Sequence, residues 1–129
     1  MLFRATNRRV TAQTDAILRD HDLTHALGGL LWELDPAVEP PAMKDLAVTL
    51  HCDRSNVTAM VEKLVQRGWA ERHEDPDDRR SKVVQLTAAG AEIRISIMRQ
   101  LVDDSVFATL PNEDLVGLLA LLRRLTIEE

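Results

Sequence analysis

The segment from residue 54 to residue 66 carries short polar side chains and a lysine along a single face. With a step of about 100° per residue, Val57, Val61 and Leu64 fall together on one side of a helix. The opposite side comprises Ser55, Asn56, Ala59, Lys63 and Gln66. A helix that enters the major groove of DNA needs short donors and acceptors for base edges and a cation for phosphate. Every amphipathic helix also has a polar outer face, so this pattern alone leaves base recognition and simple solvation open.

The charge around this segment is balanced, although the chain as a whole is acidic. The 129 residues include 16 Lys and Arg against 21 Asp and Glu, for a formal net charge of −5, a sign that disfavours a polyanionic partner. Residues 40–90 contain 8 basic and 8 acidic side chains, so the excess of acid lies in the flanking segments. A DNA-binding face is therefore compatible with this acidic protein.

The other residues that could do chemistry do not assemble into a site. His21 and His25 are four residues apart, a spacing that binds zinc on a continuous helix, but Thr24 as an N-cap places His21 before the helix begins. The acidic run 75–78 lacks the glycine and the closing glutamate of a calcium loop. Cys52 is interpreted as a small buried hydrophobe and not as a redox sensor. We therefore expect no enzyme, no cofactor and no metal.

Length and composition predict one mainly helical domain, residues 1–129. Aromatic residues make up only 3% of the chain, so the core must consist mainly of Leu, Val, Ile and Ala. A single cysteine excludes an intrachain disulfide. No targeting segment is evident and no run approaches the roughly 18 apolar residues that cross a bilayer, so we expect a cytoplasmic protein with no membrane partner.

Hydrophobic periodicity and capping residues predict six helices and one hairpin. Pro41 is expected in the first turn of the third helix, Asp53 is expected to cap the fourth, and Gly68 to end it. Gly28 and Gly29 lie inside the second helix, where they indicate a close helix crossing or, less simply, a glycine-lined ligand space. The expected elements are helices at about 2–20, 24–33, 41–51, 54–67 and 88–109, and strands at 69–73 and 82–86 around a polar loop. A sixth helix is expected to open at Pro111-Asn112 and to carry an apolar face from Leu115 to Leu125.

The order helix, tight turn, helix and hairpin is that of a winged helix-turn-helix, and residues 43–90 resemble the DNA-binding core of the MarR family of transcription regulators. The flanking helices are similar to the dimerisation region of that family, so the resemblance covers essentially the whole chain. The matching features are Leu46-Ala47, Asp53-Arg54-Ser55, Val57-Thr58, Arg67-Gly68, Asp78-x-Arg80 and Leu86-Thr87-x-x-Gly90.

The resemblance implies a mainly α fold with a small β-hairpin wing, in which the winged helix-turn-helix is flanked by N- and C-terminal dimerisation helices. The implied parts are N-terminal helices (1–35), a DNA-binding lobe (41–87) and C-terminal dimerisation helices (88–129). Arg80 is implied in the minor groove, with Asp78 orienting the arginine side chains there. Bases or nearby phosphates of the major groove would face Ser55, Asn56, Thr58 and Ala59. Phosphate contacts or their supports would be Arg54, Lys63, Arg72 and Lys82.

The predicted function is a sequence-specific regulator, expected to be a repressor, that binds a pseudo-palindromic double-stranded operator as a homodimer. The resemblance alone implies a small aromatic or phenolic effector where the dimer helices meet the DNA lobe, with His25 and Trp32 as candidate contacts. An alternative remains open: a winged-helix protein-interaction module or adapter that has lost DNA affinity. It is favoured by the acidic balance, by Ala59, which could touch only a thymine methyl, and by Glu62, which would repel phosphate.

Overall fold

The computed structural model describes residues 1–126, which form six α-helices, a short 3₁₀ helix η1 and a two-stranded antiparallel hairpin. None of the described helices is long and apolar enough to cross a membrane. The elements are α1 (Leu2–Asp20), α2 (His25–Glu33), α3 (Met43–Thr49), α4 (Arg54–Gln66), β1 (Ala70–Glu74), β2 (Lys82–Leu86), α5 (Ala88–Asp103), η1 (Val106–Thr109) and α6 (Asn112–Thr126).

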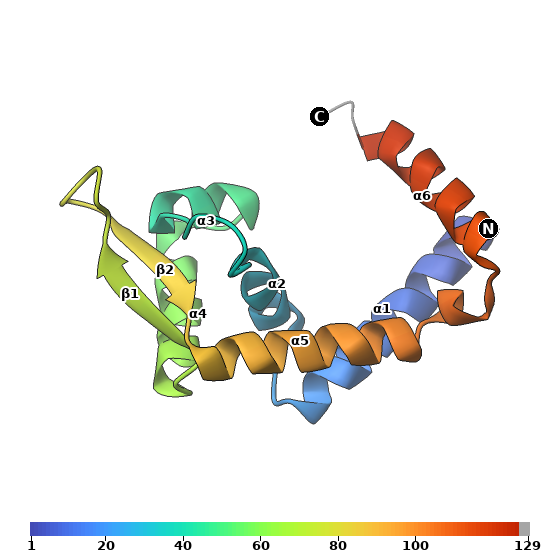
Figure 1. Cartoon of the computed structure of the whole chain (residues 1–129), viewed down its shortest axis with the longest axis horizontal. Helices are drawn as coiled ribbons and strands as arrows, with labels where there is room; N and C mark the ends of the chain where they lie inside the picture. The colour runs from blue at the N-terminus through green and yellow to red at the C-terminus, as the bar shows by residue number, and fades with distance from the viewer. Residues whose placement is uncertain (127–129) are drawn as a thin grey trace.

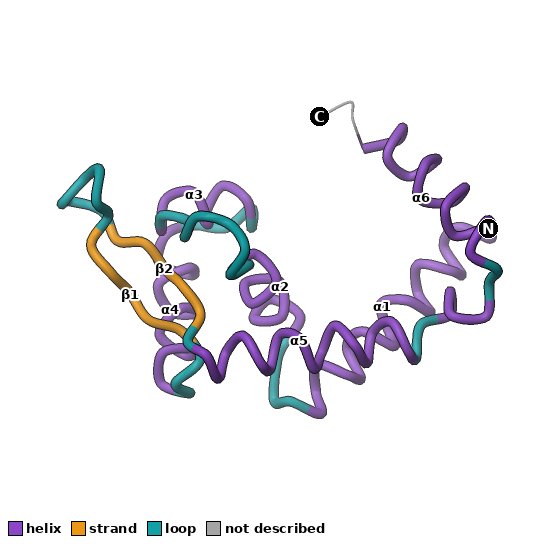
Figure 2. The backbone as a smooth tube through the Cα atoms, viewed as in Figure 1, coloured by secondary structure: helices purple, strands orange, loops and turns teal. Residues whose placement is uncertain are grey.

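The long helix α5 connects a lobe at one end of the molecule to an arm at the other (Figure 1). The lobe contains α2, α3, α4 and the hairpin, with the loop between β1 and β2 projecting at its edge (Figure 2). Helix α1 packs along α5 and carries the N-terminus toward the arm, which is formed by η1 and α6. The fold is therefore the mainly α winged helix-turn-helix that the sequence predicted.

The core of the lobe consists of aliphatic side chains, as the low aromatic content predicted. Val57, Val61 and Leu64 of α4 are all 0% exposed, so the apolar side assigned to this helix from the sequence is correct. The buried core members from the rest of the chain are Ile17, Leu18, Leu23, Leu27, Leu30, Leu31, Leu34, Leu46, Ala70, Val84 and Ile97.

The expected caps set the starts of three helices. A side-chain oxygen of Thr24 accepts a hydrogen bond from the Leu27 amide at 3.2 Å, and Asp53 accepts one from the Asn56 amide at 3.0 Å. Such a bond satisfies one of the amides that the first turn leaves free. Helix α4 is followed by Gly68 at φ 74°, the left-handed conformation that favours glycine.

Two sequence predictions about helix boundaries are wrong. Pro41 is not in the first turn of α3: it precedes the N-cap residue Ala42, and its carbonyl accepts a hydrogen bond from the Val84 amide at 3.0 Å. Pro41 and Ala42 thereby line the edge of β2, a long-range pairing that local helix preferences do not reveal. The predicted helix over 88–109 ends at Asp103.

The break after α5 is stabilised from α1. The Gln13 side chain donates to the Asp104 carbonyl at 2.6 Å and accepts from the Val106 amide at 3.1 Å. Ser105 then caps η1 by accepting from the Phe107 amide at 3.1 Å. The NH₂ group and the carbonyl oxygen of the Gln13 side chain therefore both hold the turn at which the arm begins.

The hairpin, the end of α4 and the start of α5 meet at one backbone junction. The Trp69 carbonyl accepts a hydrogen bond from the Thr87 amide at 3.0 Å, and the Thr87 hydroxyl donates to the Gly68 carbonyl at 2.6 Å. Thr87 also caps α5 by accepting from the Gly90 amide at 3.1 Å. A Cβ atom on Gly90 would lie 2.0 Å from the Trp69 oxygen, so only glycine fits there.

We expect Gly90→Ala to lower the free energy of unfolding by at least about 1–3 kcal/mol, because its methyl group would displace the Trp69 backbone. Gly29→Ala is the matched control: its Cβ would meet only Leu50, at 3.8 Å, and the helix preference of alanine favours it by up to about 1 kcal/mol. Urea denaturation followed by circular dichroism measures both. Equal stability of Gly90→Ala and the parent would contradict the packing described for the junction.

Candidate nucleic-acid interface

The outer face of α4 is exposed, and several of its polar groups are already engaged. Asp53 accepts the Asn56 amide and, at 2.8 Å, the Ser55 hydroxyl. These two hydrogen bonds, the backbone one first, lower the pKa of the Asp53 carboxyl below its usual range. The Thr58 hydroxyl donates to the Arg54 carbonyl at 2.9 Å. The Asn56 side chain, in contrast, has no hydrogen-bond partner within residues 1–126 and is available to a ligand.

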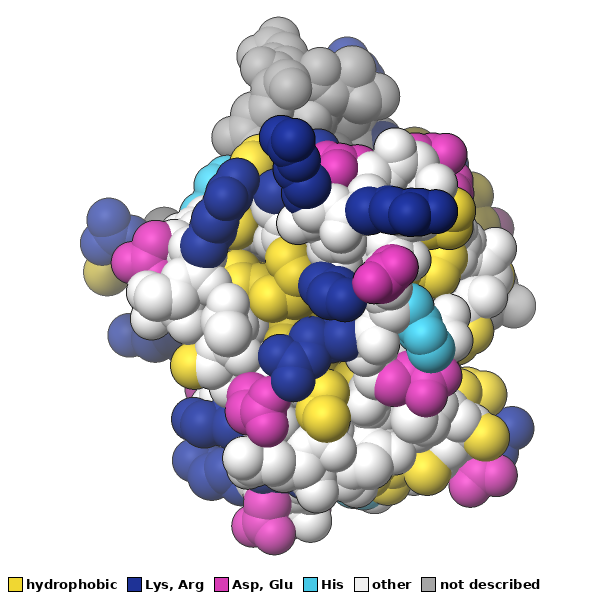
Figure 3. All heavy atoms as spheres, turned by 90° about the vertical axis from the view of Figure 1, so that its left-hand side faces the viewer, with side chains coloured by type: hydrophobic (Ala, Val, Ile, Leu, Met, Phe, Trp, Pro, Cys, Tyr) yellow, Lys and Arg dark blue, Asp and Glu magenta, His cyan; other side chains and the backbone are white. Residues whose placement is uncertain are grey.

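A basic cleft lies between α4, the start of α3 and the hairpin. It has a volume of 570 Å³ and contains five cationic side chains and one carboxylate. The lining residues are Met43, Lys44, Arg54, Thr58, Arg72, Asp78, Arg80, Ser81 and Lys82. Figure 3, in which the hairpin end of the molecule faces the viewer, shows Lys and Arg side chains gathered around a hollowed region. An elongated anion suits this concentration of positive charge.

The ten residues suggested for DNA contact fall into two adjoining groups. Six line the basic cleft, namely Arg54, Thr58, Arg72, Asp78, Arg80 and Lys82. The other four lie on the exposed side of α4, namely Ser55, Asn56, Ala59 and Lys63. Lys44, in the first turn of α3, also lines the cleft. It was not among the DNA contacts predicted from the sequence. A lysine at the start of the first motif helix was the available indication.

Glu62 is paired, which changes its expected effect on an anion. Its carboxylate accepts a hydrogen bond from Arg72 of β1 at 2.7 Å, with both side chains partly exposed. Gln66 donates weakly to the same carboxylate at 3.5 Å. The charge that was expected to repel phosphate is therefore balanced by a cation of the hairpin, and the pair connects the hairpin to α4.

The acidic residues of the wing build its turn. Asp75 accepts a hydrogen bond from the Asp77 amide at 2.9 Å, and Asp78 accepts one from the Arg80 amide at 3.0 Å. Among residues 1–126 the hydrogen bond at the Asp78 carboxylate comes from the Arg80 backbone amide, and the role of Asp78 in orienting arginine side chains stays a prediction. Asp78 thus shapes the turn that presents Arg80.

A second, mainly apolar cavity of 210 Å³ lies between α1, α2 and α5. His25 and Trp32, the two suggested effector contacts, both line it. The lining also contains Thr14, Leu18, Gly28, Gly29, Leu31, Arg94, Ile97, Met98 and Leu101. A Cβ on Gly28 would lie 2.7 Å from Leu18, so Gly28 permits the close crossing of α1 and α2, and both glycines border the cavity.

Arg94 is the cation of this cavity: its side chain is only 11% exposed, and its Nη1 lies 3.9 Å from a carboxylate oxygen of Asp35. Its guanidinium lies 5.0 Å from the centre of the Trp32 ring and donates to the Trp32 carbonyl at 3.0 Å. The Nε atom is buried without a hydrogen-bond partner among residues 1–126. A buried donor without a partner favours binding of an acceptor.

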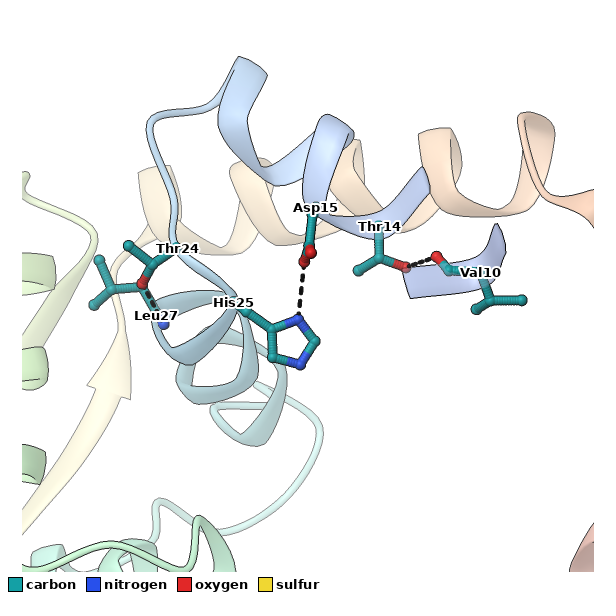
Figure 4. A network of polar contacts seen from close by, with 6 residues as sticks. All are labelled: Val10, Thr14, Asp15, Thr24, His25 and Leu27. Carbon is teal, nitrogen blue, oxygen red and sulfur yellow. Dashed lines mark hydrogen bonds and ion pairs between the residues drawn. The ribbon is translucent and has the colours of Figure 1, made fainter. Parts of the chain in front are cut away.

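The paired histidines and the cysteine have separate surroundings. His25 contacts Asp15 of α1 at 3.1 Å (Figure 4), whereas His21 contacts Gln100 of α5 at 2.9 Å. The two rings are therefore tied to different helices. Cys52 is half-buried and packs at the edge of the core, in agreement with its interpretation as a small hydrophobe.

Comparison with known proteins identifies relatives of this fold and sequence. The model of the MarR family matches residues 30–82. The multiple antibiotic resistance protein MarR of Escherichia coli is 41% identical over 49 residues, which are 38% of this chain and 34% of MarR. The uncharacterised HTH-type transcriptional regulator YhbI of Bacillus subtilis is 30% identical over 90 residues, or 70% of this chain and 58% of YhbI. The sequence matches thus span 34% of MarR and 58% of YhbI.

Solved structures match over nearly the whole chain. Wild-type MarR from E. coli in its apo form has a TM-score of 0.78 and 25% identity, over 97% of this chain and 94% of that one. A mutant of the same protein complexed with operator DNA has a TM-score of 0.73 and 26% identity, over 97% and 91% of the two chains. The likeness therefore extends from the winged lobe to the flanking helices.

Proposed function

Because the chain belongs to the MarR family of transcriptional regulators, which are not enzymes, we propose that it binds a specific DNA operator as a homodimer and represses transcription. The observation that carries this proposal is the basic cleft directly beside the exposed face of α4. A similar fold complexed with operator DNA, that of the MarR mutant, supports it.

The geometry suits a division of contacts along DNA. Helix α4 would enter the major groove, where Asn56 offers an amide to a base edge. The cleft would hold a stretch of phosphates between α4 and the hairpin, and Arg80 at the wing turn would enter the adjacent minor groove. Two copies related by a twofold axis would then contact two half-sites of a pseudo-palindrome.

One argument for the adapter alternative, the repulsion of phosphate by Glu62, no longer applies. Glu62 was expected to oppose phosphate, but it is ion-paired with Arg72 at 2.7 Å. The acidic excess lies outside residues 40–90. Of the five cations that line the cleft, Arg72 and Lys82 are ion-paired with Glu62 and Glu74. Lys44, Arg54 and Arg80 remain against the one carboxylate of the cleft, Asp78. The local charge therefore favours DNA over a protein partner.

A second copy of the chain is the proposed cover for the apolar surface of the arm. Helix α6 contains no buried residue, although its sequence has a broad leucine face. The large exposed apolar residues of α1, α5 and α6 are Leu2, Phe3, Ile95, Val102, Val116, Leu119, Leu121, Leu122 and Leu125. So large an apolar surface is unusual on a monomer.

The cavity of α1, α2 and α5 is the proposed effector site. Its apolar lining, the Trp32 ring and the buried Arg94 guanidinium fit a small aromatic or phenolic compound, and Arg94 favours one that carries an anionic group. The cavity lies between helices of the arm side, α1 and α5, and α2 of the DNA lobe. An occupant there would be able to change the spacing of the two DNA lobes.

We expect Arg80→Ala to weaken binding to the preferred duplex by about 1–3 kcal/mol, because the guanidinium would lose its minor-groove contact. The measurement is fluorescence anisotropy with the preferred and a scrambled duplex at several salt concentrations. Arg19→Ala, which changes an exposed arginine of α1, is the matched control. A parent protein that prefers no sequence from a genomic or random pool would contradict DNA regulation and favour the adapter.

We expect Leu119→Glu to dissociate the protein without unfolding it. Leu119 is 48% exposed in the single chain, so its replacement leaves the lobe intact, while a dimer would bury two unpaired carboxylates. The dissociation constant should rise by roughly a hundredfold or more, which sedimentation velocity would show. Val48→Glu, on the exposed surface of α3, should stay dimeric. A parent protein that is monomeric at micromolar concentration would exclude the proposed assembly.

We expect 4-hydroxybenzoate, which is aromatic, phenolic and anionic, to bind in the cavity and weaken DNA binding. In Trp69→Phe the only remaining tryptophan is Trp32, so a change in its emission reports occupancy. Trp32→Phe, which retains Trp69, should show no such change. Unchanged Trp32 emission at millimolar ligand would argue against this effector class.

A further inference from the structure

We propose that α4 recognises thymine through its 5-methyl group, with Ala59 and the methyl of Thr58 as the contact surface. This inference rests on the proposed DNA-binding function and makes it specific. It assigns to each operator half-site an A·T pair whose thymine faces the middle of α4, and it names Ala59 as the residue that determines specificity there.

The middle of the exposed face of α4 offers methyl groups and no free polar group. Ala59 is exposed and has no polar atom in its side chain. Thr58 is also exposed, but its hydroxyl donates to the Arg54 carbonyl at 2.9 Å, so the hydroxyl is turned to the helix backbone. What these two residues offer to a ligand is therefore apolar.

Two of the polar neighbours of this surface are engaged by other side chains. One turn before Ala59, the Ser55 hydroxyl donates to Asp53 at 2.8 Å. One turn after it, Glu62 is held by Arg72 at 2.7 Å. Asn56 lies three residues before Ala59 on the same exposed face, and its side chain has no partner within residues 1–126. Lys63, four residues after Ala59, is also exposed on this face. The apolar patch therefore lies between the Asn56 amide and the Lys63 ammonium group.

The base edges of the major groove differ in what they present to such a patch. Thymine alone carries a methyl group there, whereas adenine, guanine and cytosine present polar edges that a methyl group would leave without a partner. An amide such as that of Asn56 pairs with adenine through two hydrogen bonds. The combination therefore favours adenine near the start of α4 and thymine at its middle.

The test begins with the full chain and a pool of random duplexes, from which the preferred sequence is selected. Each thymine of that sequence is then replaced by deoxyuridine, which removes the methyl group and leaves base pairing and the minor-groove edges unchanged. Substitution under α4 should weaken binding about fourfold for each methyl lost from a buried contact. Substitution at thymines elsewhere, including those facing the wing, should have no effect.

Variants of Ala59 identify the residue responsible. In Ala59→Gly the ratio of thymine to uracil affinity should fall to about 1, while Ala89→Gly, at an exposed alanine in the first turn of α5, should retain the parent ratio. Because glycine also weakens a helix, Ala59→Gln provides a second arm. Its longer amide should shift the selected base at that position from thymine to adenine.

The outcomes separate this inference from the function on which it rests. A selected sequence whose affinity is unchanged by deoxyuridine, or an Ala59→Gly protein that still prefers thymine, overturns methyl recognition and leaves operator binding intact. A pool from which no sequence is enriched overturns both. A fourfold loss that appears under α4 and disappears in Ala59→Gly supports methyl recognition.

Discussion

The close approach of the Trp69 carbonyl to Gly90 is the contact on which the geometry of the lobe depends. It brings the end of α4, both ends of the hairpin and the start of α5 to one point, where Thr87 bonds to the Gly68 and Gly90 backbones as well. With these ends fixed, the hairpin stands beside α4 at a set distance. The basic cleft is the space that this arrangement leaves between them.

Charge is distributed over this frame in a way that the net value of −5 conceals. Asp75 and Asp78 bond to backbone amides of the wing, and Glu62 is paired with Arg72. Part of the acid in the lobe is therefore committed to structure, while Lys44 and Arg80 face the cleft. Local positive charge persists because Lys44, Arg54 and Arg80 of the cleft have no ion-pair partner among residues 1–126.

The sequence predicted the elements whose determinants are local. Thr24, Asp53 and Gly68 act within a turn of their own helices, and the apolar side of α4 follows from its periodicity. The predictions for these features were therefore correct. The prediction that Pro41 lies in α3 was wrong because Pro41 pairs with the distant β2. The prediction of one helix over 88–109 was wrong because Gln13 of α1 stabilises the break after Asp103. The Glu62–Arg72 pair and the Arg94–Trp32 stack likewise join residues whose proximity only the fold creates.

The two hydrogen bonds of the Gln13 side chain bear on the order in which the chain folds during synthesis. Gln13 leaves the ribosome early, but the carbonyl and the amide that it holds belong to residues 104 and 106, which follow about ninety residues later. Residues 25–87, whose contacts lie mostly within the lobe, can condense before that closure. The Gln13 side chain can therefore fix the direction of the arm only after residues 104 and 106 have been synthesised.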